Sequence, residues 1–335
     1  MSGAMASENN PTKLPDTLWH YTTAAGLLGI LGNEVTPPPD NDAGDVTITS
    51  SDGFTVSGSE FQAVFRATAI EYLNDHQELI HGLQFLKQVI VDYAKILEAI
   101  NYGPTDRHEI ANPADKAKFF RALCDCIDQI AARDYEHHIH CYTTSFSSKP
   151  DVLSQWRGYG GGTSGFAIGV DSSKLPTLPK RRTEGSFFHR QPFLAPVHYG
   201  HDKVPTEVTS ELTNWLHHWV YSKTQATEPT DGMLNQCVRW MSGLASRIKH
   251  PGFSEEKEWR YIDLNYYGGH AYRDGGTRLI PYTATLTLPA EAIVEVKVGP
   301  GPNQHENYLA AKGALYRFGY VAAAENLTKS ETPYR

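Results

Sequence analysis

Two short blocks of this chain combine charged and aromatic side chains at a spacing that suits chemistry. The first is residues 154–159, Ser-Gln-Trp-Arg-Gly-Tyr, followed by three glycines and an alternating apolar run from Phe166 to Val170. Glycines let a backbone approach a ligand closely, and an aromatic ring next to an arginine can clamp one. One interpretation is a ligand-binding loop on a strand. The other is a glycine-rich hairpin turn that leaves Trp156 in the core and Arg157 on the surface.

The second block is residues 256–260, Glu-Lys-Glu-Trp-Arg, which is predicted to enter a strand. Because side chains alternate along a strand, Glu256, Glu258 and Arg260 would share one face, and Trp259 would lie on the other. Polar strand faces are usually only solvated. Three charged groups aligned beside bulky aromatic neighbours are nevertheless compatible with a site.

A third candidate is His20, in the strand-like run Leu-Trp-His-Tyr-Thr-Thr at residues 18–23. Residues 24–31 follow as a short helix that Thr22 or Thr23 could cap. A polar side chain between a strand and the start of a helix is well placed to hold a ligand. The alternative for His20 is a buried imidazole that is hydrogen-bonded to the backbone.

Metal ligation has less support in the sequence. His138 and His140 would share one face of a predicted strand, but zinc needs more ligands of matching geometry. Cys124 and Cys126 lie on a predicted helix at a spacing that points them to different faces. The four cysteines contain no Cys-x-x-Cys pair, so free thiols in a reducing compartment are expected, and no metal.

The composition is typical of a globular protein with one large domain or two modest ones. Of its 335 residues, 40% are hydrophobic and 20% are charged, and the formal net charge is −8. This acidic excess argues against a protein that coats nucleic acid, which needs clustered Lys and Arg. It leaves room for a local basic patch such as Lys180-Arg181-Arg182. No apolar run has the length of a membrane span and no signal peptide is evident, so a cytoplasmic protein is expected.

Hydrophobic periodicity predicts the elements that must position these residues. Helices are predicted at residues 24–31, 78–100, 113–133, 207–223, 233–249 and 304–317. Strands are predicted at residues 18–23, 137–146, 166–170, 192–199, 256–261, 278–288, 293–299 and 320–323. Residues 1–16 are expected to be a flexible leader that starts with an expression remnant, and residues 33–60 an insertion with a small hairpin. Residues 17–335 are therefore predicted to form one α+β domain, mostly antiparallel, with helical segments at 78–133 and 207–249.

Several motifs, in chain order, resemble those of a bacterial family catalogued as domain of unknown function 2971. They are Leu-Trp-His-Tyr-Thr at 18–22, Tyr-Leu-Asn-Asp at 72–75 followed by Glu78, Ser-Phe-Ser at 145–147, Gln-Trp-Arg-Gly-Tyr at 155–159, Gly-Phe-Ala-Ile-Gly at 165–169, Glu-Lys-Glu-Trp-Arg at 256–260, Ile-Pro-Tyr at 280–282, Gly-Pro at 299–300 and Pro-Tyr-Arg at 333–335. This resemblance spans nearly the whole chain. The insertion at 33–60 departs from the compact spacing of the family.

The opening strand and helix of that family look like the start of ADP-ribosyltransferases, especially those toxins and phage-defence enzymes that modify DNA bases. This more distant resemblance implies an ADP-ribosyltransferase-like split sheet and NAD as a substrate. It implies that His20 holds the NAD ribose, that Trp156 or Tyr159 stacks on nicotinamide, and that Arg157 binds the diphosphate. The other NAD contacts that it implies are Tyr21, Thr22, Asn74, Gln155 and Arg260.

The catalytic carboxylate that the resemblance implies is Glu258 on a late strand, with Glu256 as its competitor. Breaking the bond to nicotinamide passes through an oxocarbenium-like state, which a carboxylate stabilises electrostatically. A pyridinium ring is a cation suited to an aromatic face, and an arginine matches phosphate oxygens bidentately.

The predicted function is therefore NAD-dependent ADP-ribosyl transfer by a bacterial toxin or phage-defence effector. It would act on DNA, RNA or protein, and it would have a toxin–antitoxin or defence protein as partner. One alternative is a nuclease or phosphotransferase-like enzyme. A metal nuclease would need clustered acids, and helix capping explains the nearest pair, Asp75 and Glu78, equally well. The other alternative is a non-catalytic module that senses a nucleotide or a phage protein.

Overall fold

A computed structural model describes residues 13–34, 47–49, 55–57, 61–73, 76–99, 113–161, 165–176, 192–200, 206–221, 231–264 and 270–333. Several predictions fall outside these residues. They concern most of the leader, most of the insertion at 33–60, the proposed NAD contact Asn74, the basic run 180–182 and the last two residues of the chain.

Most strands belong to one sheet. They are β1 (Thr17–Thr22), β2 (Asn33–Glu34), β5 (Phe61–Ala69), β6 (Tyr142–Ser147), β7 (Phe166–Asp171), β8 (Phe193–Pro196), β11 (Glu258–Asp263), β12 (Ala271–Asp274), β13 (Leu279–Pro289), β14 (Ile293–Val298) and β15 (Thr328–Lys329). Two smaller pairs lie apart from it. One is β3 (Thr47–Thr49) with β4 (Thr55–Ser57), which confirms the hairpin predicted in the insertion, and the other is β9 (His198–Tyr199) with β10 (Ile248–Lys249).

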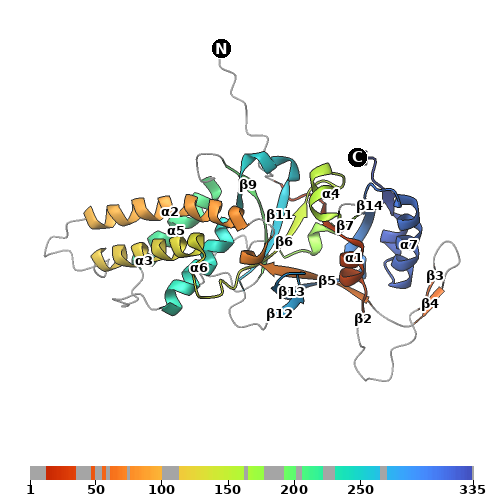
Figure 1. Ribbon diagram of the computed structural model, residues 1–335, viewed down its shortest axis with the longest axis horizontal. Helices are drawn as coiled ribbons and strands as arrows, with labels where there is room; N and C mark the ends of the chain where they lie inside the picture. Colours follow the sequence, from red (N-terminus) through yellow and green to blue (C-terminus); the bar gives the residue numbers. More distant parts are fainter. Residues whose placement is uncertain are drawn as a thin grey trace, which may run out of the picture.

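The large sheet has 11 strands and occupies the centre of the protein (Figure 1). Its main path is β12-β13-β5-β6-β1-β7-β14-β15, with β11 beside β6, β8 beside β11 and β2 beside β5. Its neighbouring strands are antiparallel except β14 and β15, which are parallel. Together with the helices around it, this sheet confirms the predicted α+β class with mostly antiparallel strands.

The sheet forks at β6. Along one edge, the whole of β6 pairs with β11. Along the other edge, its first residues pair with β5, at Thr68↔Thr143, whereas its last residue pairs with β1, at Trp19↔Ser147. The strands β5 and β1 therefore diverge from each other, and the interior of the fork must be filled by side chains.

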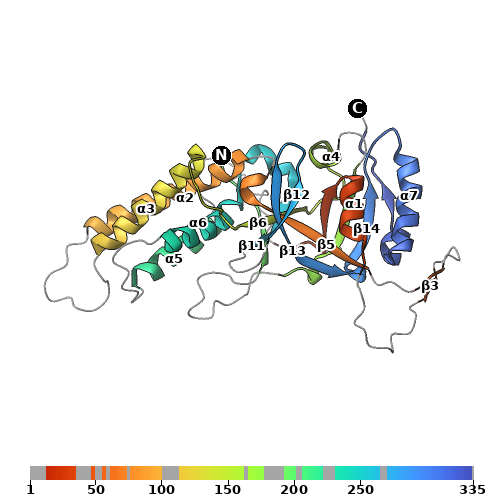
Figure 2. The ribbon, with the colours of Figure 1, turned by 60° about the horizontal axis from the view of Figure 1, so that its bottom comes forward.

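Four helices form a bundle that extends from one end of the sheet (Figures 1 and 2). They are α2 (His76–Ala99), α3 (Pro113–Ala132), α5 (Thr206–Tyr221) and α6 (Asp231–Ala245). Apolar residues recur at helical spacing along α2, so that Leu79, Leu83 and Leu86 are buried in the core of the bundle. These helices confirm the predicted ones, with the end of α6 earlier than expected.

Three further helices pack on the other part of the sheet. They are α1 (Ala24–Leu31), α7 (Gln304–Arg317) and α8 (Val321–Glu325). The hydroxyl of Thr23 caps α1 by accepting a hydrogen bond from the Gly26 N–H at 3.1 Å, one of the two caps predicted. None of the helices in the described ranges has the length and apolar character that crossing a bilayer needs.

Two predictions of element type are wrong. Residues 153–159 form the helix α4 (Leu153–Tyr159) instead of a loop, although glycines follow them directly. Residues 321–325 form α8 instead of a strand, because the alanines there bury their methyl groups against β14 in the same core. Ala has the highest helix propensity, so the three consecutive alanines favour a helix over the short strand that the apolar pattern predicted.

Two predicted strands begin later than expected because of left-handed residues. The strand predicted from residue 137 begins at Tyr142, after His140 with a φ of 52°. The strand predicted from Glu256 begins at Glu258, because Lys257 has a φ of 45°. A positive φ cannot continue an extended strand. Glu256 is instead the last residue of the 3₁₀ helix η3 (Pro251–Glu256).

Candidate active site

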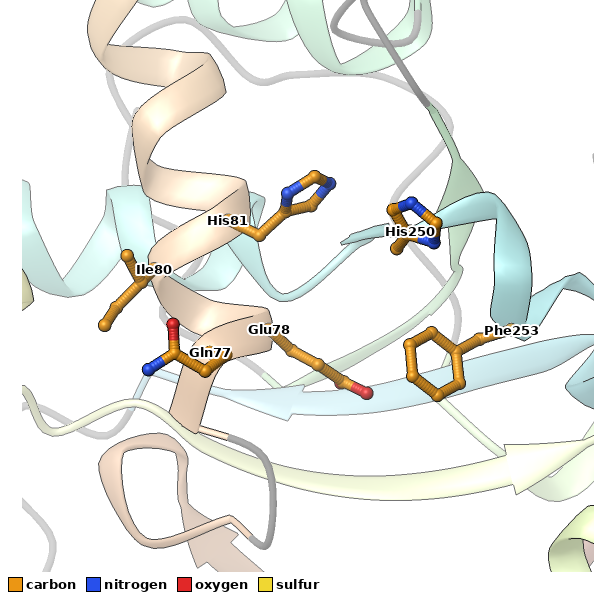
Figure 3. Close-up of a pocket in the computed structure, with 6 residues that line it drawn as sticks. All are labelled: Gln77, Glu78, Ile80, His81, His250 and Phe253. Carbon is orange, nitrogen blue, oxygen red and sulfur yellow. The ribbon is translucent and has the colours of Figure 1, made fainter.

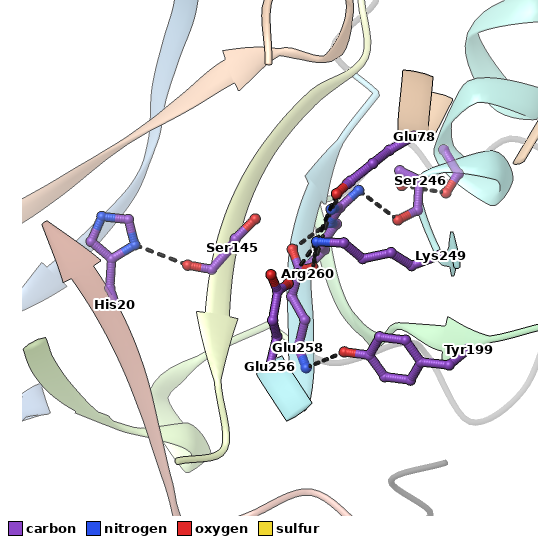
Figure 4. A network of polar contacts seen from close by, with 10 residues as sticks. His20, Glu78, Ser145, Tyr199, Ser246, Lys249, Glu256, Glu258 and Arg260 are labelled. Atoms are coloured by element: carbon purple, nitrogen blue, oxygen red, sulfur yellow. Dashed lines mark hydrogen bonds and ion pairs between the residues drawn. The ribbon is translucent and has the colours of Figure 1, made fainter. Parts of the chain in front are cut away.

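Charged side chains from distant parts of the chain meet beside β11 (Figure 4). They are Glu78 in the first turn of α2, Lys249 on β10, Glu256 at the end of η3, and Glu258 and Arg260 on β11. Glu258 and Arg260 share a face of β11 because side chains alternate along a strand. We call these five residues the charge cluster.

The ammonium group of Lys249 pairs with every carboxylate of the charge cluster. Its Nζ lies 2.6 Å from Glu256 Oε2 and 2.8 Å from Glu78 Oε1. The distance from Nζ to Glu258 Oε2 is 3.2 Å. An ammonium group has three protons to donate, so these contacts use its whole capacity. The Lys249 side chain is only 3% exposed, and its charge is therefore balanced by carboxylates and not by water.

The guanidinium group of Arg260 completes the charge cluster. Its Nε donates to Glu258 Oε1 at 2.6 Å, and its Nη2 donates to Glu258 Oε2 at 3.2 Å. Nη2 also donates to Glu78 Oε2 at 2.8 Å, and Nη1 donates to the Ser246 carbonyl at 2.8 Å. The bidentate pair with Glu258 is the geometry in which arginine binds a carboxylate most strongly.

The charge cluster has more carboxylates than cations, so it carries one net negative charge when all its groups are ionised. Burial alone would raise the pKa of Glu258, but the charges of Arg260 and Lys249 outweigh burial and lower that pKa to about 2. Burial raises the pKa of Glu256, and Lys249 only partly opposes this. Glu256 and Glu258 therefore differ in acidity. Such a difference is common in sites where one carboxyl group stays ionised and the other exchanges a proton.

A cavity of about 290 Å³ opens next to the charge cluster (Figure 3). Its walls come from the first turns of α2 and from η3 with the residue before it, and they are Gln77, Glu78, Ile80, His81, His250 and Phe253. The ring centroids of His81 and His250 are 6.1 Å apart. Glu78 belongs both to the cavity wall and to the charge cluster, so a ligand in the cavity would contact a carboxylate of the cluster.

Aromatic side chains surround the charge cluster. Lys249 Nζ lies 4.8 Å from the centroid of the Phe253 ring, and the Tyr199 hydroxyl accepts a hydrogen bond from the Glu258 N–H at 2.8 Å. Burial, and after it the charge of Glu258, raises the pKa of Tyr159 to about 12. Tyr159 is thus near the charge cluster, and the two blocks singled out in the sequence converge there.

The rest of the first block has different placements. Trp156 is buried, its Nε1 donates to Asp151 Oδ1 at 2.7 Å, and its ring centroid lies 4.6 Å from that of Tyr21. Gln155 is buried as well, whereas Arg157 is exposed. This placement agrees with the interpretation that leaves Trp156 in the core and Arg157 on the surface. The two residues lie on a helix, however, and not in a hairpin turn.

The predicted neighbours of His20 on β1 have structural contacts. The Tyr21 hydroxyl donates to the Lys149 carbonyl at 2.8 Å and accepts from the Val152 N–H at 3.1 Å, so it fixes the entry into α4. Thr22, the last residue of β1, is partly exposed. Neither residue belongs to the charge cluster, and Asn74 lies outside the described residues.

His20 itself lies inside the fork of the sheet. Its Nδ1 is 2.9 Å from the Ser145 carbonyl, and its ring packs against Phe65 and Phe146. Since Phe146 pairs with Trp259 and Ser147 pairs with Glu258, alternation puts the His20 ring and the Glu258 side chain on opposite faces of the sheet. Figure 4 shows His20 across β6 from the charge cluster. The structure does not bring these two predicted residues together.

A second group of histidines lies at the start of β6. The rings of His138, His140 and His270 are mutually 5.7 to 5.9 Å apart between centroids, and His138 Nδ1 is 2.7 Å from Glu71 Oε1. Burial, followed by the neighbouring histidines, lowers the pKa of His140. In the part of the chain that the structure describes, no three His, Cys, Asp or Glu side chains are arranged to hold a metal ion. All four cysteines are buried and free.

Comparison with known proteins gives one match. The model of a family described as "Protein of unknown function (DUF2971)" matches residues 155–261. The predicted resemblance to this family is therefore confirmed over a segment that begins at Gln155 and ends just after Arg260, and that includes both blocks of the candidate site. No curated protein matches the chain. No solved structure matches it either.

Sequence analysis missed two members of the charge cluster. Lys249 was assigned to the end of a helix, and Glu78 was explained by helix capping. A signal for Lys249 was available, because it is followed by His-Pro-Gly, which ends a helix early and lets a polar residue turn inward. No signal in the sequence could have paired Glu78 with β11, because that contact depends on how the bundle packs against the sheet.

Proposed function

We propose that the charge cluster and its cavity form the active site of an enzyme that transfers ADP-ribose from NAD. The observation that carries the proposal is the excess of one negative charge beside a cavity lined by Phe253 and two imidazole rings. Such a site favours a cationic planar ligand, and the nicotinamide ring of NAD is a pyridinium cation. The diphosphate of NAD, like any phosphodiester, is an anion and gains nothing from this excess, so it would lie away from the carboxylates.

The chemistry follows from the charge. When the N-glycosidic bond breaks, its electron pair leaves with nicotinamide and the ribose C1′ becomes oxocarbenium-like. Glu78, the carboxylate in the cavity wall, would stabilise that positive charge without reorganisation. The acceptor then bonds to C1′ and releases a proton, for which Glu256 is suited because burial raises its pKa.

Glu258 has a supporting role in this proposal. It is not among the residues that line the cavity, and its contacts with Arg260 and Lys249 hold the two cations in place. In this proposal Glu78 has the catalytic role that the resemblance implies for Glu258. His20 fills the fork of the sheet instead of holding the ribose. The acceptor class and the role as a toxin or phage-defence effector rest on the resemblance alone.

The experiment is a measurement of nicotinamide release from NAD by the purified protein, with and without mixed DNA, RNA and protein acceptors. We expect release by the wild type and a rate lower by a factor of about 100 or more in Glu78→Gln, in line with the loss of one preorganised electrostatic contact. Glu78→Gln keeps the shape of the side chain and leaves two carboxylates for two cations, so the fold should persist. Glu291→Gln, at an exposed position, is the matched control and should release nicotinamide at the wild-type rate.

Two results would contradict the proposal. One is release that is unchanged in Glu78→Gln. The other is no release with any acceptor together with no rise of the melting temperature on adding NAD. The second result would favour the binding-module alternative if another nucleotide raised the melting temperature.

One observation favours a second candidate. His81 and His250 face the same cavity (Figure 3) at a ring separation of 6.1 Å, which would suit a general acid and a general base in phosphodiester cleavage. A labelled single strand of RNA or DNA that is cut by the wild type and left intact by His250→Ala, without any NAD turnover, would support this nuclease in place of the transferase.

A further inference from the structure

Three arginines lie on β5, on β12 and on the turn that joins β12 to β13. Arg66 is on β5, Arg273 is on β12, and Arg278 is in the turn between β12 and β13. All three are exposed. This local basic group contrasts with the net charge of −8 of the whole chain.

The strand register puts Arg66 and Arg273 on one face of the sheet. Tyr282 pairs with Thr68 on one side and with Ala271 on the other, and residues two apart on a strand share a face. Contacts agree with this register. The Arg66 Cζ lies 5.3 Å from the centroid of the Tyr282 ring, and Arg273 Nη2 donates to Thr68 Oγ1 at 3.3 Å.

Arg278 extends this group toward α2. Its Cζ lies 5.7 Å from the centroid of the Tyr72 ring, and its Nη2 donates to the Tyr72 carbonyl at 3.0 Å. The rings of Tyr72 and Tyr282 are partly exposed. We call Arg66, Arg273 and Arg278, with the rings of Tyr72 and Tyr282, the arginine surface.

Within the described ranges, no carboxylate pairs with the arginine surface. Among the described residues, none of its three arginines forms an ion pair with a carboxylate, whereas Arg121, Arg247 and Arg260 each do. Burial and the nearby charge of Arg66 both lower the pKa of Arg273. Guanidinium groups that repel each other without a carboxylate between them are unfavourable unless an anion binds, and planar guanidinium groups match phosphate oxygens.

The same face of the sheet leads to the charge cluster. Thr68 pairs with Thr143 on β6, and Ser145, two residues further along β6, pairs with Arg260. Alternation therefore puts Thr68 and Arg260 on one face. Figure 2 shows β12 and β13 in the foreground beside the bundle that begins with α2. A ligand on the arginine surface could extend toward the cavity.

We propose that the arginine surface binds single-stranded nucleic acid, with phosphates on the guanidinium groups and bases stacked on the tyrosine rings. A single strand offers both of the chemical groups that this surface would satisfy, because its bases are unpaired and its backbone is anionic. A membrane offers phosphate without planar rings. This binding is separate from the proposed NAD chemistry, and it can be measured without NAD.

The test is fluorescence anisotropy with labelled oligothymidylate and oligouridylate of about 12 nucleotides, a length within the range of known single-strand sites. We expect the double variant Arg66→Gln/Arg273→Gln to bind at least ~10-fold more weakly than the wild type. Its plot of log affinity against log salt should be shallower by ~1.4, since each phosphate contact on a single strand contributes ~0.7. Arg317→Gln, exposed at the end of α7, is the matched control and should bind like the wild type.

A second variant tests the stacking. Tyr282→Ala should weaken binding of the oligonucleotide by a factor of about 5 to 100, and leave the salt slope unchanged, because it removes a ring and no charge. The proposal is overturned by equal binding of the wild type and the double variant, by no binding at low salt, or by tighter binding to phosphatidylserine vesicles than to the oligonucleotides. Should the double variant fail to fold, the two single Arg→Gln variants give the same comparison.

Discussion

Lys249 Nζ lies 2.8 Å from Glu78 Oε1, and this ion pair joins the short strand β10 to the first turn of α2. Because Lys249 also pairs with Glu258 on β11, this contact connects the bundle to the large sheet beside the cavity. The side chains are only 3% and 13% exposed, so the pair is not simply a surface contact. Loss of the Lys249 cation therefore acts both on the fold and on the candidate site.

Replacing Lys249 with Met should destabilise the protein strongly. The substitution keeps an unbranched side chain that is one atom shorter, and it removes the cation that three carboxylates share. Uncompensated buried carboxylates typically cost about 3–5 kcal/mol of unfolding free energy. Urea denaturation followed by tryptophan fluorescence would measure the loss.

A matched control separates this effect from the loss of any lysine. Lys95→Met removes a cation that pairs with Asp92 at an exposed position, and it should change the unfolding free energy by less than about 0.5 kcal/mol. In the double variant Lys249→Met/Glu78→Gln, part of the lost stability should return, because one carboxylate fewer is left unpaired. A loss of less than about 1 kcal/mol in Lys249→Met would contradict the buried network.

Glu258 should make the stability of the protein fall on acidification. Its pKa is lowered from 4.5 to about 2 in the folded state, so its contribution is present above the unfolded pKa and is lost as the pH falls toward 2. A shift of this size corresponds to an order of ~3 kcal/mol. Glu256 acts in the opposite direction, because its folded pKa is raised.

The measurement is the unfolding free energy at a series of pH values between about 2.5 and 5. The wild type should lose stability on acidification through this range, and Glu258→Gln should show a flatter dependence because the titrating group is gone. Asp171→Asn changes a carboxylate at the protein surface, held only by local hydrogen bonds to Ser173, and should keep most of the wild-type slope. Identical slopes in the wild type and Glu258→Gln would refute the assignment.

Periodicity predicted many of the elements that depend on local burial, although β5, with Ala63, Phe65 and Ala67 buried, was not among the predicted strands. The stripe on α2 is regular over its whole length, and β13 and β14 alternate on one side of a register shift in each strand, so both type and approximate bounds could be read from the sequence. By contrast, β12 was not predicted. Residues 271–274 are all exposed, and an exposed edge strand has no hydrophobic alternation to reveal it.

The candidate site could be predicted only in part, for a similar reason. Glu258 and Arg260 are two residues apart, so their common face follows from the sequence alone. Their partners Glu78 and Lys249 come from a helix and from β10, and only the tertiary packing brings them in.

His20 shows the opposite case. Its neighbours in the sequence suggested a ligand, but the fork in the sheet, which no local pattern encodes, gives the imidazole a backbone carbonyl instead.

Asp151→Ala should release the C-terminal segment from α4. Asp151 Oδ1 accepts hydrogen bonds from the Trp156 Nε1, the Ser330 hydroxyl and the Thr332 hydroxyl, and Oδ2 accepts one from the Glu331 N–H at 3.0 Å. Burial alone would raise the pKa of Asp151, but these hydrogen bonds together lower it. Losing several bonds to a charged acceptor should cost roughly 3 kcal/mol of unfolding free energy.

Hydrogen exchange distinguishes this release from a general loss of stability. The amide of Glu331 should lose its protection in Asp151→Ala, whereas amides within β14 should keep theirs relative to the global stability. Asp171→Ala, which removes a local cap of Ser173, should leave the exchange of Glu331 unchanged. Full protection of Glu331 in Asp151→Ala would show that the segment is held by other contacts.

The last prediction concerns His20, whose ring lies in the fork between β1 and β5. Burial lowers the pKa of His20, so the ring is neutral near pH 7 and its Nδ1–H donates to the Ser145 carbonyl at 2.9 Å. His20→Ala leaves a gap beside Phe65 and Phe146 and an unpaired carbonyl, which should together cost about 2–4 kcal/mol. Chemical denaturation measures this, with His305→Ala at an exposed position as the control that should stay within about 0.5 kcal/mol. An unfolding free energy that is unchanged in His20→Ala, together with weaker NAD binding, would instead support the ribose-binding role that the resemblance implies.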